Sequence, residues 1–181
     1  MSRKKALFLD IDGTLIVDKH YLSDPDGVEL ITGARDFLHD ALALGYELFL
    51  HSNQSGISRG YYTIEDTNRC NERMFELLEL PGVGFREMCM AVEAPDQEQV
   101  YRKPSPRFIL EMTEKYNLDK SESWMIGDKI EDLQAGLNAG VRTAWVATGK
   151  PKSADVERFI KENKTLELES LSDFFSVIAQ S

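Results

Sequence analysis

The chain has 181 residues, of which 42% are hydrophobic and 29% are charged, a composition that can bury a sizeable core. Its formal net charge of −10 at pH 7 argues against nucleic acid or an anionic membrane surface as the main partner, because both carry negative charge. With two cysteines, no secretory signal and no apolar run long enough to span a membrane, we expect a cytoplasmic protein with reduced thiols.

Predicted strands and helices alternate along the chain. Short apolar runs predict strands, and apolar residues that recur at helical spacing predict helices. We expect strands at residues 6–9, 46–50, 85–92, 124–126, 141–147 and 166–168. We expect helices at residues 31–42, 64–78, 106–116, 129–139, 154–160 and 171–178. This order predicts one domain over residues 1–181, with a Rossmann-like three-layer α/β/α fold and a central, mostly parallel sheet of five to six strands.

Some boundaries of these elements depend on particular residues. Thr63 and Ser153 are predicted N-caps, because a side-chain oxygen at that position accepts from a free helix amide. Ser105 followed by Pro106 has the pattern of an N-cap with proline at the first helical position. The polar residues 51–56 predict a flexible loop after the second strand.

Two carboxylates mark the end of the first predicted strand, in the sequence Asp10-Ile11-Asp12-Gly13-Thr14. Side chains alternate along an extended chain, so Asp10 and Asp12 project to the same side. Two acids at the end of a buried strand are costly unless a cation or hydrogen-bond donors satisfy them. In open α/β sheets the carboxyl end of the strands is where ligands bind. The alternative is a strand that simply ends in an Asp-Gly turn.

Three further polar pairs are expected at the same edge of the sheet. They are Ser52 with Asn53, Arg102 with Lys103, and Asp128 with Asp132. Each has a structural alternative: a serine that bonds a loop amide, a solvated surface lysine, an aspartate that caps a helix, and an exposed helical acid. Taken together, in this order and at strand ends or helix starts, the four pairs favour a functional site.

The chemistry that these residue types suit is phosphoryl transfer. Oxygen ligands from Asp10 and Asp128 suit a hard divalent cation such as Mg²⁺. Asp10 is then the expected nucleophile, which forms an aspartyl-phosphate. Asp12 lies on the same side, and we expect it to protonate the leaving oxygen and later to deprotonate the hydrolytic water.

The remaining polar residues are expected to hold the phosphate group. Ser52 and Lys103 would bind its other oxygens and stabilise their charge. Asp132, four residues after Asp128 and on the same helical face, would ligate the metal through water or orient Lys103. The hypothesis from a different class is a non-catalytic phosphate-binding or phospho-accepting module. Asp12 argues against that hypothesis, because an acceptor that must stay phosphorylated has no use for an acid that activates water.

These residues resemble the four motifs of the haloacid dehalogenase (HAD) superfamily of phosphohydrolases. The motifs, in order, are Asp10 to Thr14, Ser52, Lys103, and Gly127 to Asp132. The resemblance implies a nucleophile at Asp10, an acid/base at Asp12 and phosphate binding by Ser52 and Lys103. It also implies Mg²⁺ ligation by Asp10, by Asp128 and by the main-chain carbonyl of Asp12. The carbonyl ligand follows from the resemblance alone.

A narrower resemblance is to the D-glycero-D-manno-heptose 1,7-bisphosphate phosphatases, with the histidinol-phosphate phosphatases as close relatives. It lies in residues 52–60, 102–104, 127–135 and 148–151. It implies that Asn53 and Arg102 contact substrate, and a guanidinium suits a second anionic group. Two departures stand out. Ile11 occupies the position where this group usually has arginine, and residues 92–101 lack the Cys/His zinc loop that the group usually has.

The resemblance also bears on the size of the site. Many HAD phosphatases insert a cap domain, but residues 15–45 and 57–84 leave room only for a flap, single helices and a loop. We therefore expect no large cap domain and an open site, with residues 18–26 as its mobile rim. The prediction is a Mg²⁺-dependent phosphatase, a monomer or small homo-oligomer, that acts on a small phosphorylated metabolite. A sugar bisphosphate is the first candidate substrate, and histidinol phosphate or another phosphomonoester is the alternative.

Overall fold

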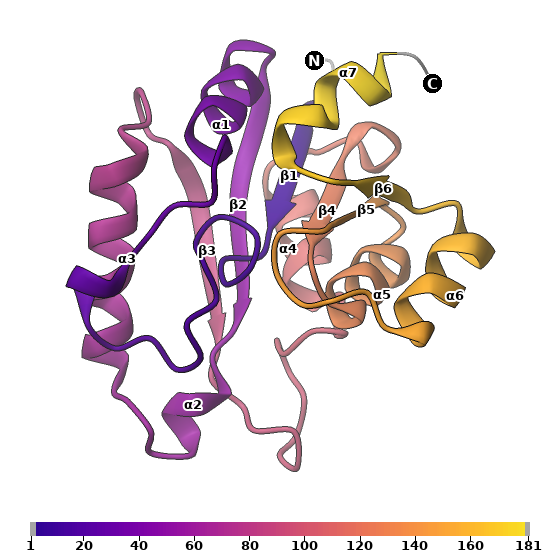
Figure 1. Ribbon diagram of the computed structural model, residues 1–181. Coiled ribbons are helices and arrows are strands. Elements are labelled where there is room, and N and C mark those ends of the chain that lie inside the picture. Colours follow the sequence, from indigo (N-terminus) through magenta and orange to yellow (C-terminus); the bar gives the residue numbers. More distant parts are fainter. Residues whose placement is uncertain (1–2, 180–181) are drawn as a thin grey trace.

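Six strands form one parallel sheet in the computed structural model, which describes residues 3–179 (Figure 1). The strands are β1 (Lys5–Leu9), β2 (Tyr46–Asn53), β3 (Phe85–Ala91), β4 (Trp124–Gly127), β5 (Arg142–Val146) and β6 (Leu166–Leu168). The α-helices are α1 (Ala34–Ala43), α2 (Ser55–Ser58), α3 (Ile64–Leu78), α4 (Arg107–Lys115), α5 (Ile130–Ala139), α6 (Ala154–Asn163) and α7 (Phe174–Ile178). Single 3₁₀ turns lie at Pro25–Gly27, Lys120–Glu122 and Leu171–Asp173.

The strand order is β3-β2-β1-β4-β5-β6, and every neighbouring pair is parallel. The chain therefore builds outward from β1 to β2 and β3, and then crosses to the other side of β1 to form β4, β5 and β6. In such a sheet, the point where the direction of winding reverses opens a crevice at the carboxyl ends of the central strands. Here that crevice lies beyond β1 and β4.

Alternating side chains of β1 supply both faces of the sheet. Leu7 and Leu9 are fully buried in a cluster with residues of α1, α3 and α7. Ala6 and Phe8 are fully buried in a second cluster with residues of α4 and α5. Helix α6 packs on the α5 side through a third cluster. Figure 1 shows these two groups of helices on opposite sides of the sheet, which confirms the predicted three-layer α/β/α fold.

The second strand is longer than predicted. Residues 51–53 continue β2 instead of forming a loop, because Ser52 and Asn53 pair with Met90 and Ala91 of β3. The short helix α2 follows directly. The polar side chains at this strand end therefore project from a hydrogen-bonded, rigid backbone.

Helix starts agree with the predicted caps in two of three places. Thr63 accepts from the amide of Asp66 and Ser153 accepts from the amide of Val156, as expected for N-caps. The prediction for Ser105 is wrong, because Pro106 occupies the N-cap position of α4. The Ser105 oxygen does accept from the amide of Arg107 at 3.4 Å, as a capping side chain would, and its hydroxyl donates to the carbonyl of Val100 at 2.8 Å.

The connections that flank β2 are short, and the part of the chain that the structure describes has no cap domain in them. Between β1 and α1, the amide of Val17 donates to the carbonyl of Glu29 at 2.9 Å, and Ile16 bridges to Leu30. Residues 18–28 thus form a surface excursion that is closed at its base, with a 3₁₀ turn within it. Within residues 3–179, no helix is both long enough and apolar enough to cross a membrane.

Gly136 sets how closely α5 approaches the sheet. A Cβ at this position would lie 2.7 Å from the Cβ of Met125 in β4 and 2.7 Å from the Cγ2 of Thr143 in β5. Replacing glycine by alanine inside a helix normally stabilises it by about 0.5–1 kcal/mol. We predict the opposite sign for Gly136→Ala, a loss of about 1–3 kcal/mol in the free energy of unfolding, because the site is overpacked.

Urea denaturation measures this difference directly. Gln134→Ala in the same helix is the matched control, and we expect it to change the free energy of unfolding by less than about 0.5 kcal/mol. A Gly136→Ala protein that is more stable than the wild type would contradict the close packing of α5.

Candidate active site

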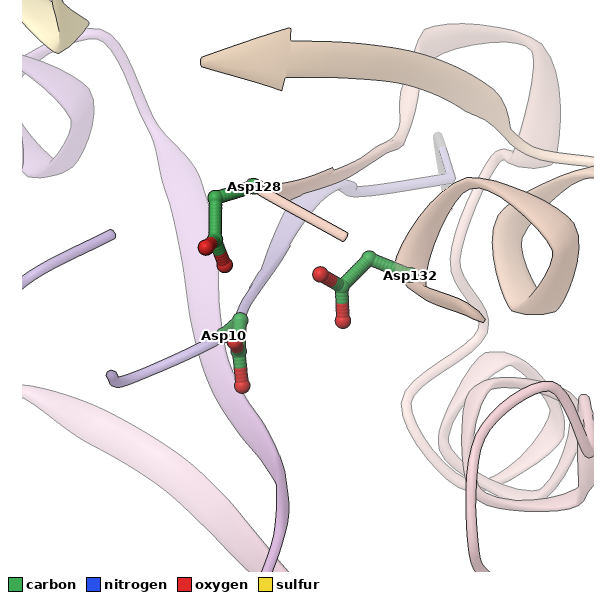
Figure 2. A group of neighbouring side chains, drawn as sticks. All are labelled: Asp10, Asp128 and Asp132. Atoms are coloured by element: carbon green, nitrogen blue, oxygen red, sulfur yellow. The ribbon is translucent and has the colours of Figure 1, made fainter. Parts of the chain in front are cut away.

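Three buried aspartates from different elements converge beyond the sheet. Asp10 follows β1, Asp128 follows β4, and Asp132 lies in the first turn of α5. One carboxylate oxygen of each lies within 4.8 Å of the others, and Figure 2 shows the three groups turned toward a shared space. The three residues are 3%, 1% and 1% exposed. Within residues 3–179, no other three side chains of the His, Cys, Asp and Glu types meet so closely.

The convergence has a different origin from the one predicted for Asp128 and Asp132. Helix α5 begins at Ile130, so Asp128 precedes the helix, and the expected shared helical face is wrong. Lys129 between them is extended (φ −116°, ψ 154°), and its amide donates to Asp132 Oδ2 at 3.0 Å. A Cβ on Gly127 would collide with the Asp132 side chain, so the close turn requires glycine.

Lys103 joins two of these aspartates in a buried ion cluster. Its Nζ lies 2.8 Å from Asp10 Oδ1 and 2.5 Å from Asp132 Oδ1, and it also donates to the carbonyl of His51. The lysine side chain is 2% exposed. All three ammonium hydrogens therefore have an acceptor. Of the two roles expected for Asp132, orientation of Lys103 is the one that this contact provides.

The two lysines determine the protonation state of Asp10. Burial raises its pKa, but the charges of Lys103 and Lys129 outweigh burial and lower the pKa to about 2. Burial likewise lowers the pKa of Lys103, and the neighbouring carboxylates outweigh it and raise that pKa. Asp10 is therefore an ionised carboxylate at neutral pH.

Lys129 is a site residue that the sequence motifs did not single out. Its Nζ lies 3.1 Å from the main-chain oxygen of Asp12, 3.4 Å from Asp10 Oδ2 and 3.5 Å from Asp128 Oδ1. These three oxygens thus surround one cationic group. The carboxylates raise the pKa of Lys129 despite its burial. A signal in the sequence was present, because this lysine directly follows an acid of the site and precedes another by three residues.

The same three oxygens fit a hard divalent cation. Asp128 Oδ2 accepts from the amide of Lys150 at 2.8 Å, whereas Asp128 Oδ1 is buried and has no hydrogen-bond partner among the described residues. A buried carboxylate oxygen without a hydrogen bond is costly, and the Lys129 ammonium at 3.5 Å gives it an ion pair only. Two carboxylates and a carbonyl form the all-oxygen donor set that Mg²⁺ prefers.

Asp12 faces a different environment from Asp10. Burial and the nearby charge of Asp10 raise its pKa to about 6. Its Oδ2 accepts from Gln54 Nε2 at 3.0 Å. Beside it lies a cavity of about 180 Å³, which is also lined by Lys129 and by Tyr21 of the surface excursion at residues 18–28. Two acids two residues apart thus have separated pKa values, the pattern expected of a nucleophile and an acid/base.

The predicted residues of β2 take different positions. Ser52 is 1% exposed, and its Oγ accepts from Gln54 Nε2 at 2.8 Å. Asn53 uses both ends of its amide on the backbone of Lys103: its Oδ1 accepts from the amide at 2.9 Å and its Nδ2 donates to the carbonyl at 3.1 Å. Asn53 therefore positions Lys103, and its contact with substrate stays a prediction.

A carboxylate closes the loop at residues 92–101. Glu93 Oε1 accepts from the amides of Val100 and Tyr101 at 3.1 and 2.8 Å. Arg102 donates to the carbonyl of Glu93 at 3.3 Å, so its guanidinium lies against this loop. Backbone and carboxylate hydrogen bonds thus order a segment that has neither Cys nor His.

Sequence and structure comparisons relate this chain to known proteins. Residues 100–174 match the model of the HAD-hydrolase-like family. The D-glycero-β-D-manno-heptose-1,7-bisphosphate 7-phosphatase of Helicobacter pylori (strain 26695) is 40% identical over 152 residues, which cover 83% of this chain and 88% of that protein. The enzyme of the same name from Pasteurella multocida is 36% identical over 182 residues, which cover 97% of each chain.

A solved structure agrees with these relatives. The crystal structure of D,D-heptose 1,7-bisphosphate phosphatase from B. bronchiseptica, complexed with magnesium and phosphate, superimposes with a TM-score of 0.83. It is 25% identical, and the match covers 97% of this chain and 98% of the other. The fold, the site and these matches together identify a phosphatase of the HAD superfamily. Within the superfamily, the chain belongs to the family of the D-glycero-β-D-manno-heptose-1,7-bisphosphate 7-phosphatases.

His51 is buried next to this site and has to stay neutral. Its Nε2 lies 2.8 Å from the carbonyl of Tyr101, which fixes the proton on that nitrogen, and its Nδ1 has no partner among the described residues. Burial and the charge of Lys103 lower the pKa of His51 from 6.5 to about 3. Between these two values the unfolded chain binds a proton that the folded chain does not bind.

Stability should therefore fall as the pH falls through 6.5, because protonation then favours the unfolded state. We predict that, between about pH 6 and pH 4, the wild type loses about 2 kcal/mol more free energy of unfolding than His51→Asn does. Urea denaturation across this range measures the difference in the free energy of unfolding, with His20→Asn in the surface excursion at residues 18–28 as the matched control. Equal pH slopes for the wild type and His51→Asn would show that His51 takes up its proton in the folded protein.

Proposed function

We propose that this phosphatase removes the 7-phosphate of D-glycero-β-D-manno-heptose 1,7-bisphosphate in a Mg²⁺-dependent reaction, and that residues 1–181 form one HAD-like hydrolase domain. Relatives that are 35–40% identical and bear the name of this activity support the substrate. The observation that carries the reaction is the pair of acids at the end of β1. Asp10 is held ionised by two lysines, and Asp12 on the same strand end has a pKa of about 6.

Asp10 is the proposed nucleophile. One of its carboxylate oxygens attacks phosphorus while the bond from phosphorus to the sugar oxygen breaks, which gives an aspartyl-phosphate. Lys103 and Asp132 hold Asp10 in place for this attack. Because the pKa of Asp10 is about 2, the nucleophile does not have to lose a proton first.

Asp12 is the proposed acid and base. Its carboxyl group gives a proton to the departing sugar oxygen in the first step. In the second step a water molecule attacks the aspartyl-phosphate at phosphorus, Asp12 takes the proton of that water, and the bond from phosphorus to Asp10 breaks to release phosphate. A pKa of about 6 lets one group fill both roles near neutral pH.

The other predicted residues bind the substrate in this proposal. The Ser52 hydroxyl donates to an oxygen of the transferred phosphoryl group, and the Lys103 ammonium exchanges one of its three acceptors for another of those oxygens. Arg102 and Asn53 are proposed to contact the rest of the substrate, with the guanidinium suited to its second phosphate. Asp10 Oδ2, the main-chain oxygen of Asp12 and Asp128 Oδ1 would hold Mg²⁺ in place of the Lys129 ammonium, which lies among them in this structure. The charge of the ion would offset that of the carboxylates and the phosphate.

Two departures from the usual pattern of the group fit this proposal. Ile11 is 2% exposed and packs in the core cluster that contains Leu9 and Leu15, so it supplies no charge to the site. The loop at residues 92–101 is ordered by Glu93, as described above, and we propose that it functions without zinc. The proposed partners are small phosphorylated metabolites in the cytoplasm, with the protein as a monomer or small homo-oligomer.

A substrate panel tests this proposal. We expect phosphate release to be fastest, by kcat/KM, from the 7-position of D-glycero-β-D-manno-heptose 1,7-bisphosphate, to be slower from sugar monophosphates, and to stop when EDTA is added. Histidinol phosphate and a 3′-phosphorylated oligonucleotide complete the panel. Asp10→Asn is the control, with a rate lower by roughly 10⁴-fold and an unchanged circular dichroism spectrum.

The panel tests the substrate, the metal requirement and the nucleophile separately. Clear preference for histidinol phosphate or another monoester would keep the reaction and reject the heptose substrate. Equal rates with Mg²⁺ and EDTA would reject the metal requirement. Release by Asp10→Asn at the wild-type rate would reject the nucleophile.

A further inference from the structure

Gln54 connects two proposed functional groups through one buried side-chain amide. The residue directly follows β2 and is 8% exposed. Its Nε2 donates to Asp12 Oδ2 at 3.0 Å and to Ser52 Oγ at 2.8 Å. Its Oε1 accepts from the Tyr62 hydroxyl at 2.6 Å. The amide nitrogen has two hydrogens, so both are used.

The direction of each hydrogen bond in this chain follows from the acceptors. An ionised carboxylate only accepts, so the nitrogen of Gln54 has to face Asp12. The carbonyl oxygen of Gln54 then faces Tyr62, whose hydroxyl has to be the donor. While Asp12 is ionised, a reversed amide would direct Oε1 at its carboxylate and leave two acceptors in contact without a proton between them.

Two consequences follow for the groups that Gln54 contacts. The amide hydrogen engages Asp12 Oδ2, so a proton on this acid is carried by Oδ1, the oxygen that Gln54 does not contact. The second amide hydrogen engages a lone pair of Ser52 Oγ, so the hydroxyl hydrogen of Ser52 is free to donate elsewhere. One amide thus orients both the Asp12 carboxyl and the Ser52 hydroxyl.

Tyr62 holds this amide from the other side. Its side chain is 9% exposed, and its ring packs against the backbone of Gly56 in α2. A Cβ on Gly56 would lie 2.6 Å from the Tyr62 Cζ and 2.8 Å from its hydroxyl oxygen. The absence of a side chain at residue 56 therefore admits the tyrosine, and without its hydroxyl the buried oxygen of Gln54 would have no partner among these groups.

We propose that Gln54 is a positioning residue of this phosphatase, which orients the Asp12 carboxyl and the Ser52 hydroxyl, and that Tyr62 holds Gln54 in the required direction. This inference rests on the acid/base role proposed for Asp12. Neither Gln54 nor Tyr62 has to touch the reacting atoms.

The test compares two leaving groups by kcat/KM, which reports the steps up to the departure of the alcohol. A sugar oxygen needs a proton to leave, whereas 4-nitrophenolate leaves without one. Methionine is close to glutamine in shape but lacks the amide. We expect Gln54→Met to lower kcat/KM for heptose 1,7-bisphosphate by about 10²-fold. For 4-nitrophenyl phosphate the loss should be smaller by a factor of about ten or more. Tyr62→Phe should give the same selectivity with a smaller loss of about fivefold.

Two controls separate this inference from the proposed function. Tyr61→Phe alters an exposed neighbour whose ring contacts that of Tyr21 at a tilt, and it should leave both substrates unaffected. Asp12→Asn should show the same selectivity as Gln54→Met, only larger. If Asp12→Asn lowers both substrates equally, the proposed acid role fails.

The inference fails alone if Asp12→Asn is selective while Gln54→Met lowers both substrates equally, or lowers neither. Equal losses would mean that Gln54 does not orient the acid. Thermal unfolding of the variant then separates a loss of stability from the loss of the Ser52 contact, which affects both substrates alike. Should Gln54→Met not fold, the comparison of Tyr62→Phe with Tyr61→Phe decides, and identical behaviour of these two variants contradicts the proposal.

Discussion

The site depends on the burial of one ammonium group among oxygen acceptors. Lys103 contributes a full positive charge at a point where its side chain is 2% exposed, and such burial costs several kcal/mol unless every hydrogen is paired. The three acceptors come from three elements: Asp10 after β1, His51 in β2 and Asp132 in α5. Removing any partner would leave a buried charge, so the lysine holds these elements in one arrangement.

Other features of the molecule follow from this cluster. His51 is held neutral because burial, and after it the charge of Lys103, lowers its pKa. Asn53 fixes the backbone of Lys103 with both ends of its amide. Gly127 leaves the space that Asp132 needs. Each of these residues acts on the lysine or its partners, at the adjoining ends of the paired strands β1, β2 and β4.

The charges of the site residues do not balance, and this imbalance bears on the need for a metal ion. Asp10, Asp12, Asp128 and Asp132 face Lys103 and Lys129. When all six are ionised, four negative charges oppose two positive ones, which leaves a net charge of −2; with the proton that Asp12 gives to the leaving group in place, the net charge is −1. Either excess is unfavourable for a phosphate ester by itself, and one divalent cation offsets it. The proposed Mg²⁺ requirement is therefore what an acidic protein needs in order to admit an anionic substrate.

The sequence predicts the parts of this site that depend on short-range patterns. The order of strands and helices follows from apolar periodicity, and the places of Asp10, Lys103 and Asp128 follow from motifs at strand ends. Contacts between side chains that are far apart in the sequence were not predictable in this way. Lys129 reaches Asp10 only because the turn after β4 is extended, and that turn also corrected the expected geometry of Asp132.

The residues after β2 show the same limit. Polar side chains at residues 51–53 indicated a loop, but pairing with β3 is a long-range property that side-chain polarity does not report. Gln54 lies within the resemblance at residues 52–60, but that resemblance gave it no role. Its importance comes from Asp12, 42 residues earlier in the chain, and from Tyr62 in the segment after α2. Hydrogen-bond direction could be assigned only once these three side chains were placed together.

The most direct test of the account is to find the phosphoryl group on Asp10 during turnover. A rapid acid quench of the wild-type enzyme in its first turnover with heptose 1,7-bisphosphate, followed by digestion and mass spectrometry, should give the peptide that contains Asp10 with the added mass of one phosphoryl group. The modification should appear before free phosphate and decay as phosphate is released. Release of phosphate with no modified peptide at any time would mean that water attacks the substrate directly, and the central role of Asp10 as nucleophile would then be wrong.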